Sequence, residues 1–93
     1  MYNKRMIYEW DENKNATNLS KHKIDFNRVV EFEWDSAFEY IDDRQDYGET
    51  RYCALGYIDI RIFHLTFTYR DEGIRVISLR KATKREEKQY AEA

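Results

Sequence analysis

The stretch that decides the fold is Ile60–Lys81, which reads IRIFHLTFTYRDEGIRVISLRK. Two runs of alternating apolar and polar residues flank Asp71–Gly73, and this pattern predicts a β-hairpin. The loop suits a three-residue turn with Gly73 in the left-handed conformation. Because successive side chains of a strand point to opposite faces, one face of the hairpin is apolar. It collects Phe63, Leu65, Phe67, Tyr69, Ile77 and Leu79.

The opposite face of the predicted hairpin is polar. The three-residue turn pairs Arg70 with Ile74, Thr68 with Val76, Thr66 with Ser78 and His64 with Arg80. A two-residue turn would instead place Thr68 beside Ile77 and Phe67 beside Ser78, and would mix the two faces. We favour the first register because a one-residue slip exposes the core set. Arg75 falls on the apolar side by alternation, near enough to the turn to reach over the sheet edge.

The N-terminal part of the chain predicts a strand followed by two helices. Met6–Trp10 reads as the strand, and Asp11 suits the N-cap of a helix over Glu12–Lys23. Asp25 can cap the second helix, and Ile24 with Val29 matches a hydrophobic staple. The buried side of this second helix is expected to hold Phe26, Val29, Val30 and Phe32.

Further strands and a last helix complete the prediction. Ser36–Asp42 and Arg51–Ile58 read as strands around a polar loop over Asp43–Thr50. A capping box over Thr83–Glu86 starts a helix that should run to about Tyr90. The prediction is an α+β fold over residues 1–93, one domain. It has an antiparallel meander sheet, with two N-terminal helices and one C-terminal helix packed on one face.

Composition excludes several classes of protein. The 93 residues carry 16 Lys and Arg against 18 Asp and Glu, a balance that argues against a general nucleic-acid coat protein. Aromatic residues make up 16%, too many for a disordered chain. The single cysteine, Cys53, excludes an internal disulfide or a Cys-based zinc site and agrees with a cytoplasmic location. We expect no membrane span, and no secretory signal because Met1–Arg5 is polar.

The polar face predicts a place for phosphate, since guanidinium forks match phosphate oxygens. Arg70 and Arg80 lie on it, near Arg51 on a neighbouring strand. A row on the first helix offers a second wall for a groove: Lys14, Asn18 and Lys21. Aromatic rings that could stack on bases are Tyr47, Tyr52 and Tyr90. Surface arginines are usually only solvated, so this pattern alone is weak.

A resemblance gives the pattern more weight. Its motifs are W-D-x-x-K-N-x-x-N-x-x-K-H from Trp10 and I-R-x-I-S-x-R-x-A-T-x-x-E from Ile74. The segments involved are Tyr8–His22, Ile24–Phe26, Tyr47–Arg51, Thr68–Arg70, Ile74–Glu86 and Tyr90. Over nearly its whole length the chain resembles the BrnT toxin family.

The resemblance implies a RelE-like fold and a bacterial ribonuclease toxin of a type II toxin–antitoxin pair that inhibits translation. The implied partner is a BrnA-like ribbon-helix-helix antitoxin in a two-plus-two complex that binds operator DNA through the antitoxin. His64 receives no role from the resemblance.

The implied chemistry is RNA cleavage without metal, in which the 2′-hydroxyl attacks the adjacent phosphate. Arg70 and Arg80 would clamp the phosphate with help from Arg51, and Lys21 or His22 would transfer protons. Glu49 would act as a base or orient Arg51. The remaining candidate RNA contacts are Lys14, Asn18, Thr68, Arg75 and Tyr90.

Several of these residues also have an ordinary structural reading. His22 can be a helix C-cap that favours the helix dipole, and Glu49–Arg51 a structural ion pair. Arg75 can face an edge or a partner, and Tyr90 can pack in the core. The acidic group in the loop fits no calcium loop, so we expect no metal or cofactor: Asp42, Asp43, Asp46 and Glu49.

Two other functions remain as alternatives to the toxin. One is a non-catalytic RNA- or protein-binding module of the same fold. The other is a DNA-binding regulator acting alone, which the absence of a basic recognition helix disfavours.

Overall fold

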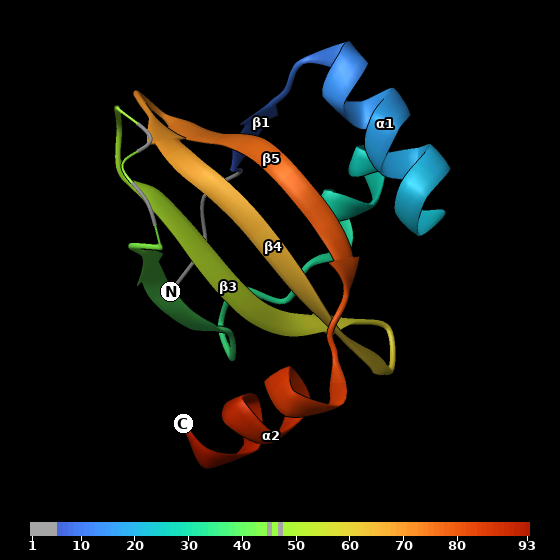
Figure 1. The fold of residues 1–93 in the computed structure, drawn as a ribbon, viewed down its shortest axis with the longest axis vertical. Helices are drawn as coiled ribbons and strands as arrows, with labels where there is room; N and C mark the ends of the chain where they lie inside the picture. Colours follow the sequence, from blue (N-terminus) through green and yellow to red (C-terminus); the bar gives the residue numbers. More distant parts are fainter. Residues whose placement is uncertain (1–5, 45, 47) are drawn as a thin grey trace.

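The computed structural model describes residues 6–44, 46 and 48–93 (Figure 1). Five strands form one sheet in the order β1-β5-β4-β3-β2. The strands are β1 (Ile7–Glu9), β2 (Phe38–Asp42), β3 (Arg51–Ile58), β4 (Arg61–Arg70) and β5 (Gly73–Lys81). The helices are α1 (Glu12–His22), the 3₁₀-helix η1 (Phe26–Glu31) and α2 (Lys84–Glu92). The expectations for Met1–Arg5 and for Tyr47 lie outside the described residues.

The sheet is mixed, which corrects the predicted antiparallel meander. Strands β2 to β5 are antiparallel neighbours, but β1 runs parallel to β5 and pairs Ile7 with Gly73. Gly73 lies inside β5 and has a negative φ, so its predicted left-handed conformation is wrong. A Cβ at Gly73 would collide with the backbone oxygen of Ile7. Glycine is therefore needed for the close approach of β1.

The register of the β4–β5 hairpin is confirmed at one end and wrong at the other. His64 pairs with Arg80 and Thr66 with Ser78, as predicted. Nearer the turn, Thr68 pairs with Arg75 and Arg70 with Gly73, because the turn has only two residues. A register shift between Thr66 and Phe67 absorbs the extra residue, Ile77. A β-bulge thus replaces the three-residue loop.

The bulge moves four side chains from their predicted positions. Ile74 and Val76, predicted on the polar face, lie in the core, and Arg75 and Ile77 are displaced as well. Ile74, Val76 and Leu79 are buried in the core, whereas Ile77 is only half-buried and lies beside α1. Arg75 lies on the polar face, where it bonds Glu9. The predicted membership of Ile77 in the apolar face and the predicted side of Arg75 are therefore both wrong.

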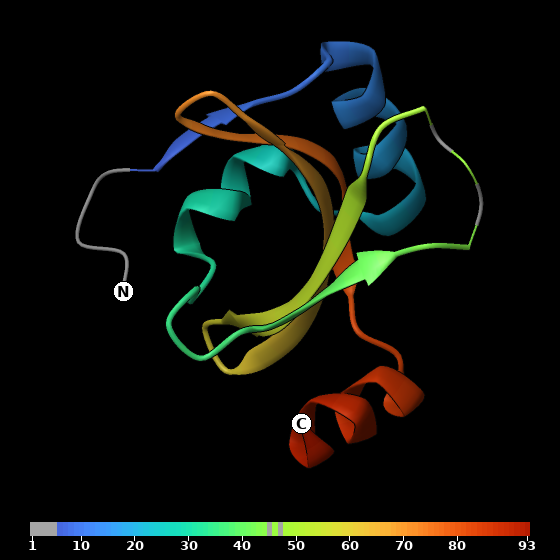
Figure 2. The ribbon, with the colours of Figure 1, turned by 90° about the vertical axis from the view of Figure 1, so that its left-hand side faces the viewer.

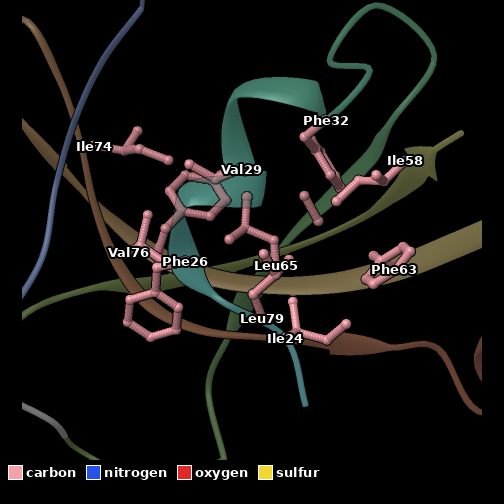
Figure 3. Packing of buried hydrophobic residues seen from close by; sticks show 12 residues of the cluster. Ile24, Phe26, Val29, Phe32, Ile58, Phe63, Leu65, Ile74, Val76 and Leu79 are labelled. Atoms are coloured by element: carbon pink, nitrogen blue, oxygen red, sulfur yellow. The ribbon is translucent and has the colours of Figure 1, made fainter. Parts of the chain in front are cut away.

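The core lies between the sheet and η1, which sits inside the curve of the sheet (Figures 2 and 3). Asp25 caps η1 and Ile24 and Val29 are both buried, as predicted. The second helix is 3₁₀ rather than α, with three residues per turn. Phe26, Val29 and Phe32 therefore share its buried side, while Val30 is 70% exposed, against the prediction.

Strand β1 pairs with only the first three residues of β5, and helix α1 lies along the edge of β5 beyond them. The buried Asn18 amide donates to the carbonyl of Leu79 at 2.7 Å and accepts from the Leu79 N–H at 3.2 Å. It also donates to the carbonyl of Ile24 at 3.0 Å. Asn15 accepts from the Phe26 N–H at 2.8 Å. Two buried asparagines thus hold a helix whose apolar stripe is narrow.

Helix α2 begins at the predicted capping box, in which Thr83 and Glu86 bond each other's backbone N–H. It lies at the opposite end of the sheet from α1 (Figure 1). Tyr90 packs edge-on against Tyr57. The Tyr57 side chain points away from the core, because its neighbours Gly56 and Ile58 lie on the core side of β3 and side chains alternate along a strand. Helices η1 and α2 therefore lie on different faces, and the prediction of all helices on one face is wrong.

Candidate functional site

The face of the sheet opposite the core carries three rows of cross-strand neighbours. The row nearest the β4–β5 turn holds Asp42, Arg51, Thr68 and Arg75. The middle row holds Tyr40, Cys53, Thr66 and Ser78. The third row holds Phe38, Leu55, His64 and Arg80. The predicted arginines do share this polar face, although His64, Thr66 and Thr68 on it are buried.

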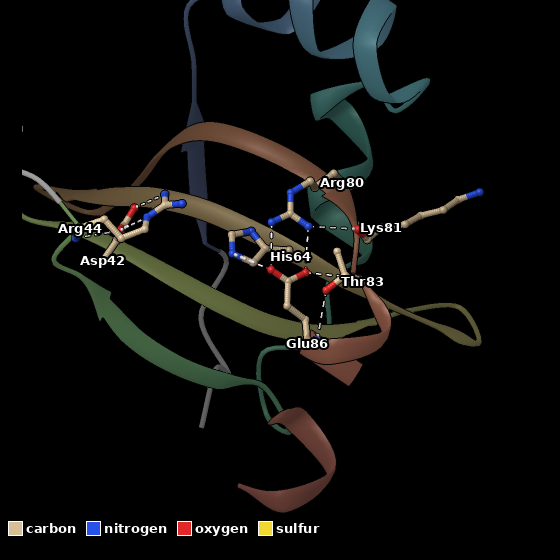
Figure 4. Close-up of polar contacts among 7 residues, drawn as sticks. All are labelled: Asp42, Arg44, His64, Arg80, Lys81, Thr83 and Glu86. Carbon is tan, nitrogen blue, oxygen red and sulfur yellow. Dashed lines mark hydrogen bonds and ion pairs between the residues drawn. The ribbon is translucent and has the colours of Figure 1, made fainter. Parts of the chain in front are cut away.

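Arg80 lies at the end of β5 and forms a two-bond ion pair with Glu86 (Figure 4). Its Nη1 and Nη2 donate to the two carboxylate oxygens of Glu86 at 2.8 and 2.9 Å. This pairing raises the pKa of Arg80 and lowers the pKa of Glu86 to about 2. The Arg80 side chain remains 27% exposed, so a ligand could still reach it.

An open groove of about 440 Å³ runs between α1 and β5. It is lined by Asp11, Asn13, Lys14, Thr17, Asn18, Lys21, His22, Ile77 and Ser78. Burial and the positive charges of Lys21 and Arg80 lower the pKa of His22. A neutral imidazole at neutral pH can accept a proton. Lys21 and His22 therefore line the groove together, and Arg80 lies near enough for its charge to influence His22.

Arg70 lies at the other end of the same face. Its Nη1 is 3.2 Å from Glu49 and its Nε 3.7 Å from Glu9. Arg70 lies six positions along β4 from His64, the partner of Arg80. At about 3.3 Å per residue this separation is about 20 Å. Arg70 and Arg80 cannot grip one phosphate together, which corrects the predicted clamp.

The other carboxylates near Arg70 also differ from the predicted pairing. Glu49 forms its ion pair with Arg70, although the sequence favoured Arg51. Arg51 is half-buried in the row of Asp42 and Thr68. Arg75 donates to Glu9 at 2.9 Å. Glu9 thus bridges two arginines at the turn end of the face.

Besides Arg75, three of the predicted RNA contacts have structural partners. The Asn18 amide is committed to backbone groups, as described above. The Thr68 hydroxyl donates to the carbonyl of Thr50 at 2.9 Å. The Tyr90 hydroxyl donates to the carbonyl of Ser36 at 3.0 Å, and its ring packs on Tyr57. Lys14 and Lys21, in contrast, are exposed and line the groove.

Sequence reasoning missed Glu86, Arg44 and the burial of His64. The capping box marked Glu86, but nothing local showed that its carboxylate also reaches Arg80. Arg44 binds Asp42 through two hydrogen bonds of 2.8 Å, within the loop read as solvated. His64 is buried with its Nε2 3.8 Å from Glu86. Burial is the first cause, and the charge of Arg80 the second, of its lowered pKa.

The described residues include no cluster of three His, Cys, Asp or Glu side chains arranged to bind a metal ion. In the same part of the chain, no helix has the length and apolarity that a membrane crossing requires.

Comparisons with known proteins show the family to which the chain is similar. Residues 10–86 match the family model described as "Ribonuclease toxin, BrnT, of type II toxin-antitoxin system". The chain is also similar to the 1.1 Å crystal structure of the Brucella abortus ribonuclease toxin BrnT, with a TM-score of 0.68 and 28% identity. That alignment covers 86% of this chain and 100% of the Brucella chain. No curated protein sequence matches significantly.

Proposed function

Because the chain belongs to the BrnT family of ribonuclease toxins of type II toxin–antitoxin systems, we propose that it cleaves RNA without a metal ion and thereby inhibits translation. The family description supplies the ribonuclease toxin, and the metal-free route is our inference from the side chains. The observation that carries it is that Lys21 and His22 line the α1–β5 groove, with Arg80 near enough for its charge to act on His22.

Each of these side chains suits one step of cleavage by the 2′-hydroxyl. Arg80 can stabilise the charge that develops on the phosphate, since guanidinium donors match its oxygens. His22, whose pKa is lowered, can accept the hydroxyl proton. Lys21, exposed on the last turn of α1, can donate a proton to the leaving oxygen or stabilise its charge. These assignments need no group outside the chain.

The turn end of the polar face has a second role in this proposal. An RNA strand that leaves the groove along β5 would pass Arg75 and then Arg70, which lies about 20 Å from Arg80. These arginines, with Arg51, would contact flanking phosphates and raise affinity. Phosphate contacts of this kind position a nucleic acid without reading its sequence.

The test uses purified protein with a short single-stranded RNA in excess EDTA. We expect cleavage to persist and to leave 2′,3′-cyclic phosphate ends. RNA with 2′-O-methyl groups should stay intact, because its nucleophile is blocked. Loss of cleavage in EDTA that Mg²⁺ restores would overturn the metal-free route. Cleavage of the 2′-O-methyl substrate would overturn the role of the hydroxyl.

Translation and the partner are tested separately. Added to a cell-free translation reaction, the protein should stop synthesis, and a BrnA-like antitoxin should restore it.

The family implies an antitoxin, and we propose a ribbon-helix-helix protein in a two-plus-two complex. Light scattering of the co-expressed complex should give the mass of two copies of each chain. Tight RNA binding with no cleavage would instead favour the non-catalytic binding module.

A further inference from the structure

We propose that Glu86 is a positioning residue for Arg80. It takes the two terminal nitrogens of the guanidinium and leaves the Nε edge as a second fork for an RNA phosphate. The inference rests on the proposed ribonuclease function, because it gives one member of that site its orientation.

The hydrogen bonds of Arg80 define which donors remain. A guanidinium has five N–H groups. Glu86 accepts two, from Nη1 at 2.8 Å and from Nη2 at 2.9 Å, and the carbonyl of Lys81 accepts another from Nη1 at 3.3 Å. Two donors are left, on Nε and on Nη2, and none of the described residues accepts from Nε. Figure 4 shows Nε on the side of the guanidinium away from Glu86.

The two remaining donors suit a phosphate. In a guanidinium, Nε and the neighbouring terminal nitrogen point two N–H groups in parallel, at the spacing of two oxygens of one phosphate. An arginine can thus bind a carboxylate at one edge and a phosphate at the other. A free arginine at a strand end would sample many rotamers, and the pair with Glu86 removes that freedom.

Glu86 is itself held from three sides. The Thr83 N–H donates to its Oε1 at 2.9 Å, and the Glu86 N–H donates to the Thr83 hydroxyl at 3.1 Å. The buried ring of His64 lies behind it, with Nε2 3.8 Å from Oε2. The carboxylate therefore has little room to move. Through it, the position of α2 determines where the Arg80 guanidinium lies.

Two rival readings make different predictions. If Glu86 only attaches α2 to the sheet, its charge affects stability but not the chemical step. If Glu86 masks Arg80, removing the charge speeds cleavage. If it positions Arg80, removing the charge lowers kcat, while KM stays level or falls because one negative charge near the polyanion is lost.

The variant that separates these readings is Glu86→Gln. Glutamine also serves in a capping box, so α2 keeps its start while the charged bidentate pair is lost. The matched control is Glu87→Gln, which changes the net charge equally on a side chain that lines a separate pocket with Tyr57 and Ile60, outside the α1–β5 groove. Both variants are assayed on a short RNA, at a temperature where circular dichroism shows them folded.

We expect Glu86→Gln to lower kcat by 10-fold or more, up to roughly 10²-fold, with KM level or lower, and Glu87→Gln to match the parent. In an Arg80→Ala background, Glu86→Gln should have no further effect, since it acts through Arg80. An unchanged or increased kcat for Glu86→Gln would overturn the proposal.

A second measurement does not depend on cleavage. In ¹H–¹⁵N spectra of the parent, a 2′-O-methyl RNA oligonucleotide should shift the Arg80 Nε–H signal, and Glu86→Gln should reduce that shift. A response equal in both proteins would contradict the positioning role. If the parent fails to cut RNA, the proposed function fails, and this titration still decides the role of Glu86.

Discussion

Both ends of the polar face carry arginine–glutamate ion pairs, but the pairs differ in geometry and in exposure to solvent. At one end, Arg80 and Glu86 form a two-bond pair at 2.8 and 2.9 Å that is 27% and 17% exposed. At the other end, Arg70 divides its charge between Glu49 and Glu9 at 3.2 and 3.7 Å, and all three side chains are more than a third exposed. Both sets are arginine–glutamate pairs on one sheet face.

The difference lies in what holds each carboxylate. Glu86 belongs to a capping box and lies against a buried histidine, so contacts other than the one with Arg80 hold its carboxylate in place. Glu49 belongs to a loop, and Glu9 to a three-residue edge strand. An exposed pair gains little because water screens it and two long side chains must be ordered. Position in the fold, rather than residue type, therefore decides which arginine is held in place and which stays exposed.

The largest expected effect comes from Arg80→Ala. Loss of a preorganised donor to the developing phosphate charge should slow RNA cleavage by roughly 10²–10³-fold. Single-turnover cleavage of a short RNA measures it, with Lys81→Ala as the control because that neighbour is exposed. Cleavage within threefold of the parent would remove Arg80 from the site.

The next effect is the dependence of stability on pH. The pKa of Glu86 is about 2 in the folded chain against 4.5 for an ordinary glutamate. A lowered folded pKa contributes stability that is present above about 4.5 and is lost as the pH falls toward 2. The stabilisation should be on the order of 3 kcal/mol at pH 7.

Urea unfolding at a series of pH values measures this contribution. The difference in free energy of unfolding between the parent and Glu86→Gln should narrow as the pH falls from 5 to 2.5. The difference between the parent and Glu49→Gln should be much smaller at every pH. A gap that stays constant with pH would show that Glu86 stabilises by packing rather than by charge.

A smaller effect should follow Gly73→Ala, which disturbs only the turn end. The new Cβ collides with the backbone of Ile7, so β1 must shift and the free energy of unfolding should fall by roughly 1–3 kcal/mol. Hydrogen exchange of the β1 amides should rise while that of α2 stays level. Faster exchange at α2 would show that the two ends are coupled.

The smallest effect is expected for Arg70→Ala. Its ion pairs are exposed, so stability should change by less than about 1 kcal/mol. RNA affinity should fall a few-fold, with a shallower dependence on salt because one phosphate contact is lost. Filter binding at several salt concentrations measures this slope. A loss of cleavage as large as that of Arg80→Ala would contradict the division between the two ends.

Much of the fold followed from local signals in the sequence. Alternation over residues 51–81 placed β3, β4 and β5 within a residue of their bounds, and the capping box placed the start of α2. Such signals depend on neighbours along the chain. The parallel pairing of β1 and the bulge at Ile77 depend on contacts far along the chain, so alternation alone could not reveal them.

The site was predicted less well than the fold. The polar face was correctly assigned to Arg70 and Arg80, but the distance between them follows from the register and was overlooked. Asn18 shows a different difficulty. The sequence predicted this polar residue of α1 as part of a groove wall. It is buried instead, because its amide completes backbone hydrogen bonds of β5. The relation to RelE-like toxins and the single-domain organisation remain predictions.

The Asn18 amide has a consequence for assembly. An exposed strand edge invites other chains to add a strand, which leads to aggregation or to unintended pairing. Asn18 occupies both backbone groups of Leu79 and so acts as a one-residue substitute for a neighbouring strand beyond β1. With that stretch of β5 blocked, the five-residue β2 is the longer of the two outer strands in the described sheet, next to the three-residue β1 at the other side.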